Sequence, residues 1–138
     1  MKSQKLVKEL QDLIEKGLEH YPVPYVKGNS IRIGAMVVRT SKHGNLVYDT
    51  VENKKVAHCV TKSAAIAIAR TYKKDPKAIQ SILHIDDNIS KHLNDAMFYK
   101  HGMKTADDMR YDILETRLDI SLARARNDRA QLDKYIYF

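Results

Sequence analysis

The segment from Ile31 to Arg70 constrains the fold more than any other part of the chain. Apolar and polar residues alternate over short stretches that end at turn residues, and an alanine-rich apolar run follows them. Alternation with a period of two is typical of half-buried strands. Connections of only a few residues force neighbouring strands to pair antiparallel. The segment therefore predicts three antiparallel strands that lead directly into a helix.

The register of the first predicted strand can be stated from its apolar residues. One face carries Ile31, Ile33, Ala35 and Val37. Arg32 and Met36 lie on the opposite face of the same strand. We expect the apolar face to pack against the helix that contains Ala65 and Ile68. This expectation depends on the register, because a shift of one residue would exchange the two faces.

Turn residues separate the second and third predicted strands from their neighbours. Gly44 and Asn45 suit a tight hairpin turn before the second strand, and Asn53 marks the turn before the third. Thr61 is a suitable N-cap for the helix after the third strand. The apolar run of that helix, residues 64–69, is too short to cross a membrane, which predicts a buried helix.

Helices are predicted on both sides of this segment. Residues 3–20 carry an apolar stripe at helical spacing, and Pro22 and Pro24 end it because each proline removes an amide donor. Asp75 followed by Pro76 is typical of a helix start. The apolar repeat after them predicts a helix to about residue 100, and a further repeat predicts a last helix to about residue 135.

The short connection between the last two helices predicts an antiparallel helical hairpin. The expected fold class is α+β: an N-terminal helix, a three-stranded antiparallel meander, a helix and the C-terminal hairpin. We divide the chain into a basic α-β-β-β-α unit, residues 1–74, and a helical hairpin extension, residues 75–138. The extension is expected to pack on the first unit or to form an arm.

Positive charge is concentrated in the first of these units. Residues 1–74 contain 14 Lys and Arg against 6 Asp and Glu, a net charge of +8, whereas residues 75–138 contain 10 against 11, a net charge of −1; together they give the +7 of the whole chain. A local excess of positive charge is typical of proteins that bind a polyanion. We expect nucleic acid, DNA or RNA, to contact six basic residues: Arg32, Arg39, Lys42, Lys54, Lys55 and Lys62.

Two other interpretations of this basic unit stay open. Its order of elements resembles that of double-stranded-RNA-binding domains, in which basic residues at the start of the last helix reach phosphates. Lys62 occupies that place, but Ser63 and Ala64 follow it where that family has further lysines, so no binding residues are carried over. Alternatively, the basic surface serves only packing and solubility, in a structural or assembly component that works through protein-protein contacts.

The C-terminal half suggests a relationship with phage proteins. The segments DDNISKHLNDAMFYKHGMKTADDM and ETRLDISLARAR, with the terminal YIYF, resemble small uncharacterised proteins of marine tailed bacteriophages. The resemblance covers most of the chain from Ile31. It implies a virion component or a phage accessory protein, in the host cytoplasm or in the virion, and it supplies no known function.

The residues that could support catalysis or bind a metal are poorly arranged. His84 and His92 are eight residues apart, which rotates them by roughly 80° on a helix, whereas helical metal ligands usually lie four apart. His58 and Cys59 point to opposite faces of a strand, and the sequence contains no GxSxG, P-loop or CxxC motif. We expect a non-enzymatic protein without a cofactor, a metal site or a membrane partner. The single cysteine suits a reducing compartment.

The last predicted helix carries two charged stripes. One is acidic and contains Asp108, Asp112, Glu115 and Asp119. The other lies beside it and contains Arg110, Arg117 and Arg124. Like charges at this spacing repel one another. The acidic stripe is therefore either a solvated face or a surface that meets positive charge, on this protein's own sheet unit or on a second copy.

The end of the chain is a candidate interface. A helix from residue 106 to residue 135 would be about 45 Å long, and the shorter helix before it would leave its distal end unmatched. Aromatic residues are common interface anchors. We expect this end to contact a second copy or a partner protein through Leu132, Tyr135, Ile136, Tyr137 and Phe138. The alternative is that these side chains fold back onto the protein's own core.

Overall fold

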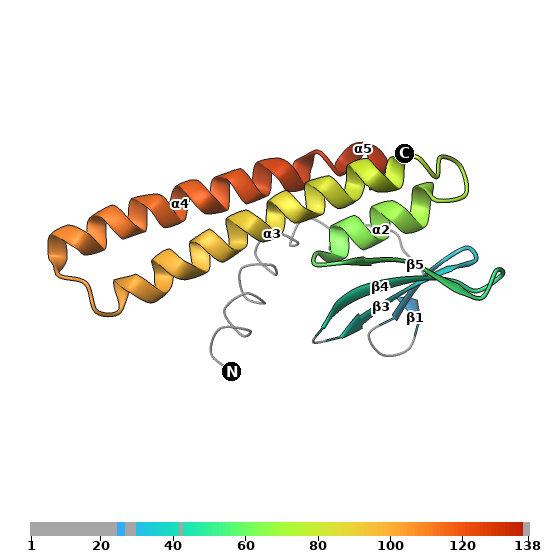
Figure 1. Cartoon of the computed structure of the whole chain (residues 1–138), viewed down its shortest axis with the longest axis horizontal. Coiled ribbons are helices and arrows are strands. Elements are labelled where there is room, and N and C mark those ends of the chain that lie inside the picture. Colours follow the sequence, from blue (N-terminus) through green and yellow to red (C-terminus); the bar gives the residue numbers. More distant parts are fainter. Residues whose placement is uncertain (1–24, 27–29, 42, 137–138) are drawn as a thin grey trace.

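The structure, a computed structural model of the 138-residue chain, describes residues 25–26, 30–41 and 43–136. It has the predicted α+β class, with one antiparallel sheet and helices that follow it (Figure 1). The strands are β1 (Tyr25–Val26), β2 (Ser30–Ile33), β3 (Met36–Ser41), β4 (Gly44–Asp49) and β5 (Lys54–Cys59). The helices are α2 (Lys62–Thr71), α3 (Ala78–Met103), α4 (Asp108–Ala130) and α5 (Asp133–Ile136). The helix predicted in residues 3–20 lies outside the described residues.

The strand number differs from the prediction because the first predicted strand is a hairpin. The sheet has five strands in the order β1-β2-β3-β4-β5, and β1 contains only two residues. Ile33 pairs with Met36 across a two-residue turn. Gly34 has a φ of 59°, which glycine adopts without steric cost, and this is the pattern of a type II′ turn. A chain reversal at this turn replaces the predicted continuous strand.

The hairpin also corrects the predicted register of this region. Ile31 is buried as expected, but Met36 and Val38 are buried in place of Ala35 and Val37. The two-residue turn shifts the alternation by one position, so β2 buries odd-numbered residues and β3 buries even-numbered ones. Arg32 is exposed, as the prediction requires. The apolar face of the sheet therefore begins with Ile31 and continues through Val38.

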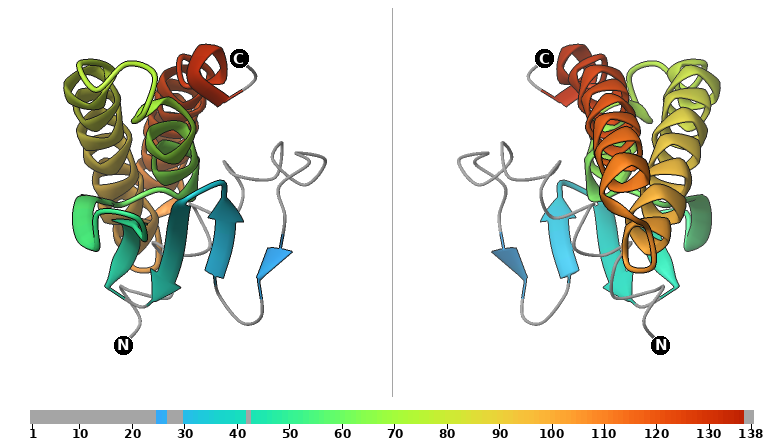
Figure 2. Two further views of the ribbon diagram at one scale, coloured as in Figure 1. Left: turned by 90° about the vertical axis from the view of Figure 1, so that its right-hand side faces the viewer. Right: turned by 90° about the vertical axis from the view of Figure 1, so that its left-hand side faces the viewer.

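The helix α2 lies between the sheet and the helical hairpin (Figures 1 and 2). Thr61 caps it as predicted, since its side chain accepts a hydrogen bond from the Ala64 amide at 3.2 Å. Eight of its ten residues are buried: Ser63, Ala64, Ala65, Ile66, Ala67, Ile68, Ala69 and Thr71. Its small side chains allow both layers to approach the helix closely. The prediction of a buried, alanine-rich helix is confirmed.

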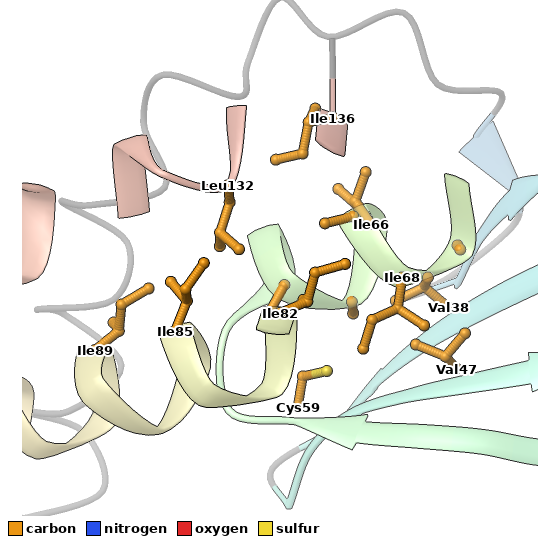
Figure 3. Packing of buried hydrophobic residues seen from close by; sticks show 14 of the residues in the cluster. Val38, Val47, Cys59, Ile66, Ile68, Ile82, Ile85, Ile89, Leu132 and Ile136 are labelled. Atoms are coloured by element: carbon orange, nitrogen blue, oxygen red, sulfur yellow. The ribbon is translucent and has the colours of Figure 1, made fainter. Parts of the chain in front are cut away.

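A single apolar core joins the sheet to the base of the hairpin. Val38 and Val47 come from the sheet, whereas Ile82 and Ile89 come from α3 (Figure 3). The helices α3 and α4 run antiparallel beside one another, and the connection between them lies far from the sheet (Figure 1). The predicted hairpin is present, with helices of 26 and 23 residues.

The end of the chain is not the exposed arm that the sequence suggested. The helix α4 ends at Ala130, and the short helix α5 then packs against α2. Leu132 and Ile136 are fully buried in the protein's own core, and Tyr135 packs partly buried against it (Figure 3). Leu132 and Ile136 are therefore core residues, which corrects their predicted role at an interface. Tyr137 and Phe138 lie outside the described residues.

Substitutions at Gly34 and Gly44 test how turn geometry affects the stability of the sheet. Gly34 has open space where a Cβ would lie, whereas a Cβ on Gly44, at a φ of 118°, would lie 2.9 Å from the Cys59 carbonyl oxygen. Gly34→Ala should lower the free energy of unfolding by about 1 kcal/mol from backbone strain alone. Gly44→Ala should lower it further, because the backbone of β5 must also move. Urea unfolding of the two variants would contradict this account if Gly34→Ala were the more destabilised.

Candidate nucleic-acid interface on the open sheet face

Two rows of side chains cross the face of the sheet that points away from the helices. Residues opposite one another in antiparallel strands point to the same face, so the register identifies each row. The first row contains Arg32, Val37, Tyr48 and Lys55. The second row contains Ser30, Arg39, Leu46 and His58. We refer to these eight residues as the open sheet face.

The open sheet face combines exposed cations with partly exposed apolar and aromatic groups. Arg32, Arg39 and Lys55 are exposed, and so is His58. Val37, Leu46 and Tyr48 are half-buried between them. The described helices all lie on the other side of the sheet (Figure 2). The strands thus present positive charge and one aromatic ring on a surface that no described element covers.

A bulge in β5 places Lys55 on this face. Val47 pairs with Ala57, but its neighbour Tyr48 pairs with Lys55, so Val56 is the additional residue of β5. Lys55 and His58 consequently point to the same side of the sheet although they are three residues apart. Without the bulge, one of these two side chains would face the core.

Tyr48 is held in place at the edge of the open sheet face. Its hydroxyl donates a hydrogen bond to the Asn53 side-chain oxygen, in the turn that follows β4. Asn53 has a φ of 55°, which confirms the predicted turn. Since the hydroxyl is bound at one end of the ring, the position of the ring on this surface is fixed.

The six predicted binding residues do not form one surface. Arg32, Arg39 and Lys55 share the open sheet face, whereas Lys42 lies outside the described residues. Lys54 is the first residue of β5, whereas Lys62 follows the other end of that strand and begins α2, so the two lie at opposite ends of β5. Of the five that the structure describes, the register of the strands thus brings three together.

Lys54 is engaged in an ion pair at the rim of the sheet. Its ammonium group lies 2.8 Å from a Glu52 carboxylate oxygen and 5.9 Å from the centre of the Tyr72 ring. The hydrogen bond that Lys54 donates to the Glu52 carboxylate raises the pKa of Lys54 and lowers the pKa of Glu52. The charge of Lys54 is therefore partly balanced within the chain.

A second rim contact involves the buried carboxylate of Asp49. One oxygen accepts hydrogen bonds from the Val51 and Glu52 amides at 3.0 and 3.2 Å. The other oxygen lies 2.7 Å from the Lys73 ammonium group, which follows α2. The hydrogen bond from Lys73 holds the pKa of Asp49 below its usual range, although burial acts in the opposite direction. Asp49 and Glu52 are thus satisfied at the rim and do not face the open sheet face.

The structure locates the histidines and the cysteine that the sequence offered as candidates for metal or thiol chemistry. No cluster of three or more His, Cys, Asp or Glu that could hold a metal ion occurs among residues 25–26, 30–41 and 43–136. The His92 ring lies 3.2 Å from an Asp128 carboxylate oxygen and links α3 to α4, whereas His84 is exposed. Cys59 is fully buried, as predicted, and burial raises the pKa of its thiol.

Sequence reasoning missed Tyr48, Leu46, Val37 and His58 as parts of this surface. The alternation of the second predicted strand places Leu46 and Tyr48 together, so this signal was present in the sequence. The position of Val37 depended on the hairpin at Gly34, and that of His58 depended on the bulge. Neither irregularity has a distinctive sequence pattern here.

Comparison with known proteins identifies no matching family model, no similar curated protein and no similar solved structure. The resemblance to phage proteins therefore stays a prediction. Among the described residues, no helix is both long and apolar enough to span a membrane.

The Asp49 contact predicts a specific dependence of stability on pH. A carboxylate with a lowered pKa stabilises the fold above its unfolded-state pKa of about 4, and this contribution is lost as the pH falls through the folded-state value. Asp49→Asn should therefore lower the free energy of unfolding at pH 7. The difference from the unmodified protein should be smaller at pH 3. Urea unfolding at both values provides the measurement.

Two variants control for other effects of this substitution. Lys73→Met removes the other partner of the ion pair. Its loss of unfolding free energy, relative to the unmodified protein, should likewise be smaller at pH 3 than at pH 7. Asp95→Asn changes an exposed carboxylate on α3 and should have little effect at either pH. An Asp49→Asn deficit of equal size at pH 7 and pH 3 would contradict the assigned role of the pair.

Proposed function

We propose that the protein is a non-enzymatic nucleic-acid-binding protein whose ligand, a single strand of DNA or RNA, lies across the open sheet face. The observation that supports this most directly is the position of Tyr48 among Arg32, Arg39 and Lys55 on a surface that no described helix covers. Single strands are bound by aromatic rings that stack on bases and by cations that contact phosphates. The open sheet face offers both groups in one layer.

The distribution of carboxylates favours an anionic ligand on this side of the sheet. The eight residues of the open sheet face include three permanent cations and no Asp or Glu. The carboxylates nearest in the sequence, Asp49 and Glu52, are paired with Lys73 and Lys54 at the rim. The three cations of the open sheet face could therefore contact a phosphate backbone with no carboxylate among the residues of that face.

Each residue has a role in this proposal. Arg32 and Arg39 contact phosphates, for which the planar guanidinium group is well suited. Tyr48 stacks on a base, and the half-buried Val37 and Leu46 form an apolar floor beside it. From Arg32 on β2 to Lys55 on β5 the face is about 14 Å wide, since neighbouring strands are about 4.8 Å apart. The site would accommodate a short stretch of a few nucleotides.

The salt dependence of binding tests the cationic part of the proposal. Fluorescence anisotropy with labelled oligo(dT) and oligo(U) should show binding that weakens steeply as the salt concentration rises. The triple variant Arg32→Ala, Arg39→Ala, Lys55→Ala should bind more weakly. The slope of its plot of log K against log salt concentration should be less steep by about 2, because each lost phosphate contact to a single strand changes that slope by about 0.7.

A control variant with the same change in net charge tests whether binding depends on contacts at the open sheet face or only on the total charge of the protein. Lys77, Lys91 and Lys104 are exposed on or beside α3, and none of them belongs to the sheet. Replacing these three with Ala should leave most of the affinity and of the salt slope in place. The proposal fails if the unmodified protein ignores both DNA and RNA at low salt, or if the two triple variants lose affinity equally.

The aromatic part of the proposal is tested at Tyr48. Tyr48→Ala should weaken binding to a single strand by about 5- to 150-fold, because stacking on one base contributes about 1–3 kcal/mol. Tyr48→Phe keeps the ring and should bind within a few fold of the unmodified protein. If Tyr48→Ala and Tyr48→Phe bind with the same affinity in this anisotropy assay, the ring does not stack on a base.

The main alternative is a structural or assembly component that works only through protein-protein contacts. The observation that favours it is the exposure of large apolar side chains on α3 and α4, far from the open sheet face. Phe98 and Met109 are 72% and 78% exposed. A protein with this function would show no salt-dependent binding of nucleic acid and would still form assemblies.

A further inference from the structure

The helix α4 presents a second apolar surface, separate from the surface that packs on α3. Leu114, Ser121 and Ala125 are its buried residues. Met109, Ile113 and Ile120 are 78%, 49% and 45% exposed. At 100° per residue these three lie within a stripe about 40° wide, roughly 120° around the helix from the buried residues. Exposed apolar residues aligned along one helix are typical of an interaction surface.

The exposed stripe follows a seven-residue repeat. Ile113, Ile120 and Asn127 lie seven residues apart and occupy the a positions of this repeat. Met109, Thr116, Ala123 and Ala130 also lie seven apart and occupy the d positions. All seven are exposed. Alternating a and d positions form the seam through which two helices pack in a coiled coil.

The polar members of this seam are compatible with burial between two helices. The Thr116 hydroxyl donates a hydrogen bond to the Asp112 backbone carbonyl at 3.0 Å, so it is already satisfied within α4. Asn127 is at an a position, where a single asparagine in each helix favours a parallel, in-register, two-stranded coiled coil. Ala123 and Ala130 are small and allow the two helices to approach closely at this end.

The charges that flank the seam indicate which partner fits it. Arg110, Arg117 and Arg124 occupy successive e positions. Asp112 and Asp119 occupy the first two g positions, and Arg126 occupies the third. All six side chains are exposed, and none forms an ion pair with another described residue. One side of the seam is therefore positive, and the other is negative at the first two of its three positions.

This charge pattern is complementary to itself only when two helices are parallel. In a parallel pair, each g residue faces the e residue that lies five positions later in the partner helix. Asp112 then faces Arg117 of the second copy, and Asp119 faces Arg124. In an antiparallel pair, the e positions would face one another and bring arginines together. The opposite charges on the two flanks thus favour a second copy in the parallel orientation.

We propose that two copies of this chain form a parallel, two-fold symmetric dimer through a coiled coil of their α4 helices. The contact runs along the 23 residues of α4, about 34 Å, which accommodates three heptads. Phe98 lies on the side of α3 opposite its buried residues and takes no part in it. Because the helices are parallel, the two sheets lie at the same end of the dimer.

The mass of the full-length protein in solution tests the dimer. Sedimentation equilibrium should give a mass of about twice the 15.9 kDa of one chain. Ile113→Asp should raise the dissociation constant about a hundredfold or more, because it places an unpaired charge in the seam. Phe98→Asp changes a more exposed apolar residue outside the seam and should leave the dissociation constant unchanged. Circular dichroism would verify that both variants are folded.

The charge pairs are tested by exchange. Arg117→Asp should weaken the dimer, because it places two carboxylates opposite one another. The double variant Asp112→Arg, Arg117→Asp should restore much of the affinity, because it exchanges the two charges of each pair. Such a recovery is not expected if the residues affect only the stability of the monomer.

The orientation is tested by cross-linking. Ala123→Cys at a d position should form a disulfide between the two copies on mild oxidation, since parallel helices bring the two residue-123 positions into range. The buried Cys59 should not interfere. A dimer that forms no disulfide would overturn the parallel arrangement. A monomeric full-length protein at high concentration would overturn the dimer and leave the stripe on α4 to a different partner protein.

Discussion

The burial of α2 between the sheet and the hairpin is the constraint on which the rest of the structure depends. Its alanines allow two layers to pack on one helix, and Asp86 of α3 secures its start. The Asp86 carboxylate accepts hydrogen bonds from the Val60 amide at 2.8 Å and from the Thr61 amide and hydroxyl at 3.0 and 2.8 Å. Asp86 is only 2% exposed, and this burial raises its pKa. Strand β5, α2 and α3 are thereby joined at one point.

The sequence predicted elements more reliably than their boundaries and faces. The Thr61 cap, the Asn53 turn, the buried alanine-rich helix and the helical hairpin all have local signals that the structure confirms. The Gly34 hairpin escaped prediction because one glycine in an alternating pattern does not by itself indicate a reversal. The end of α4 was not predicted because no glycine or proline marks it. Leu132 and Ile136 therefore seemed to continue an exposed helix, although both are buried in the protein's own core.

Only part of the candidate site could be predicted, because charge in the sequence says nothing about which charges are already paired. Lys54 and Lys73 bind carboxylates that the turn after β4 brings to them, and this pairing depends on where α2 ends. Arg32, Arg39 and Lys55 are separated from those carboxylates by the sheet itself. The net charge of the first 74 residues therefore overstates the positive charge available to a ligand and does not indicate its location.

The bulge at Val56 has a consequence for how the surface of this protein could change. In a regular strand, residues separated by an odd number of positions lie on opposite faces, and the bulge converts the odd separation of Lys55 and His58 into a shared face. The bulge thus accommodates Val56 as an additional residue while Lys55 stays opposite Tyr48 on the open sheet face. Loss of Val56 would make this part of β5 regular, with Lys55 still opposite Tyr48. The face on which Lys55 lies therefore does not depend on whether β5 contains the additional residue, so the two lengths of this strand would present the same cation.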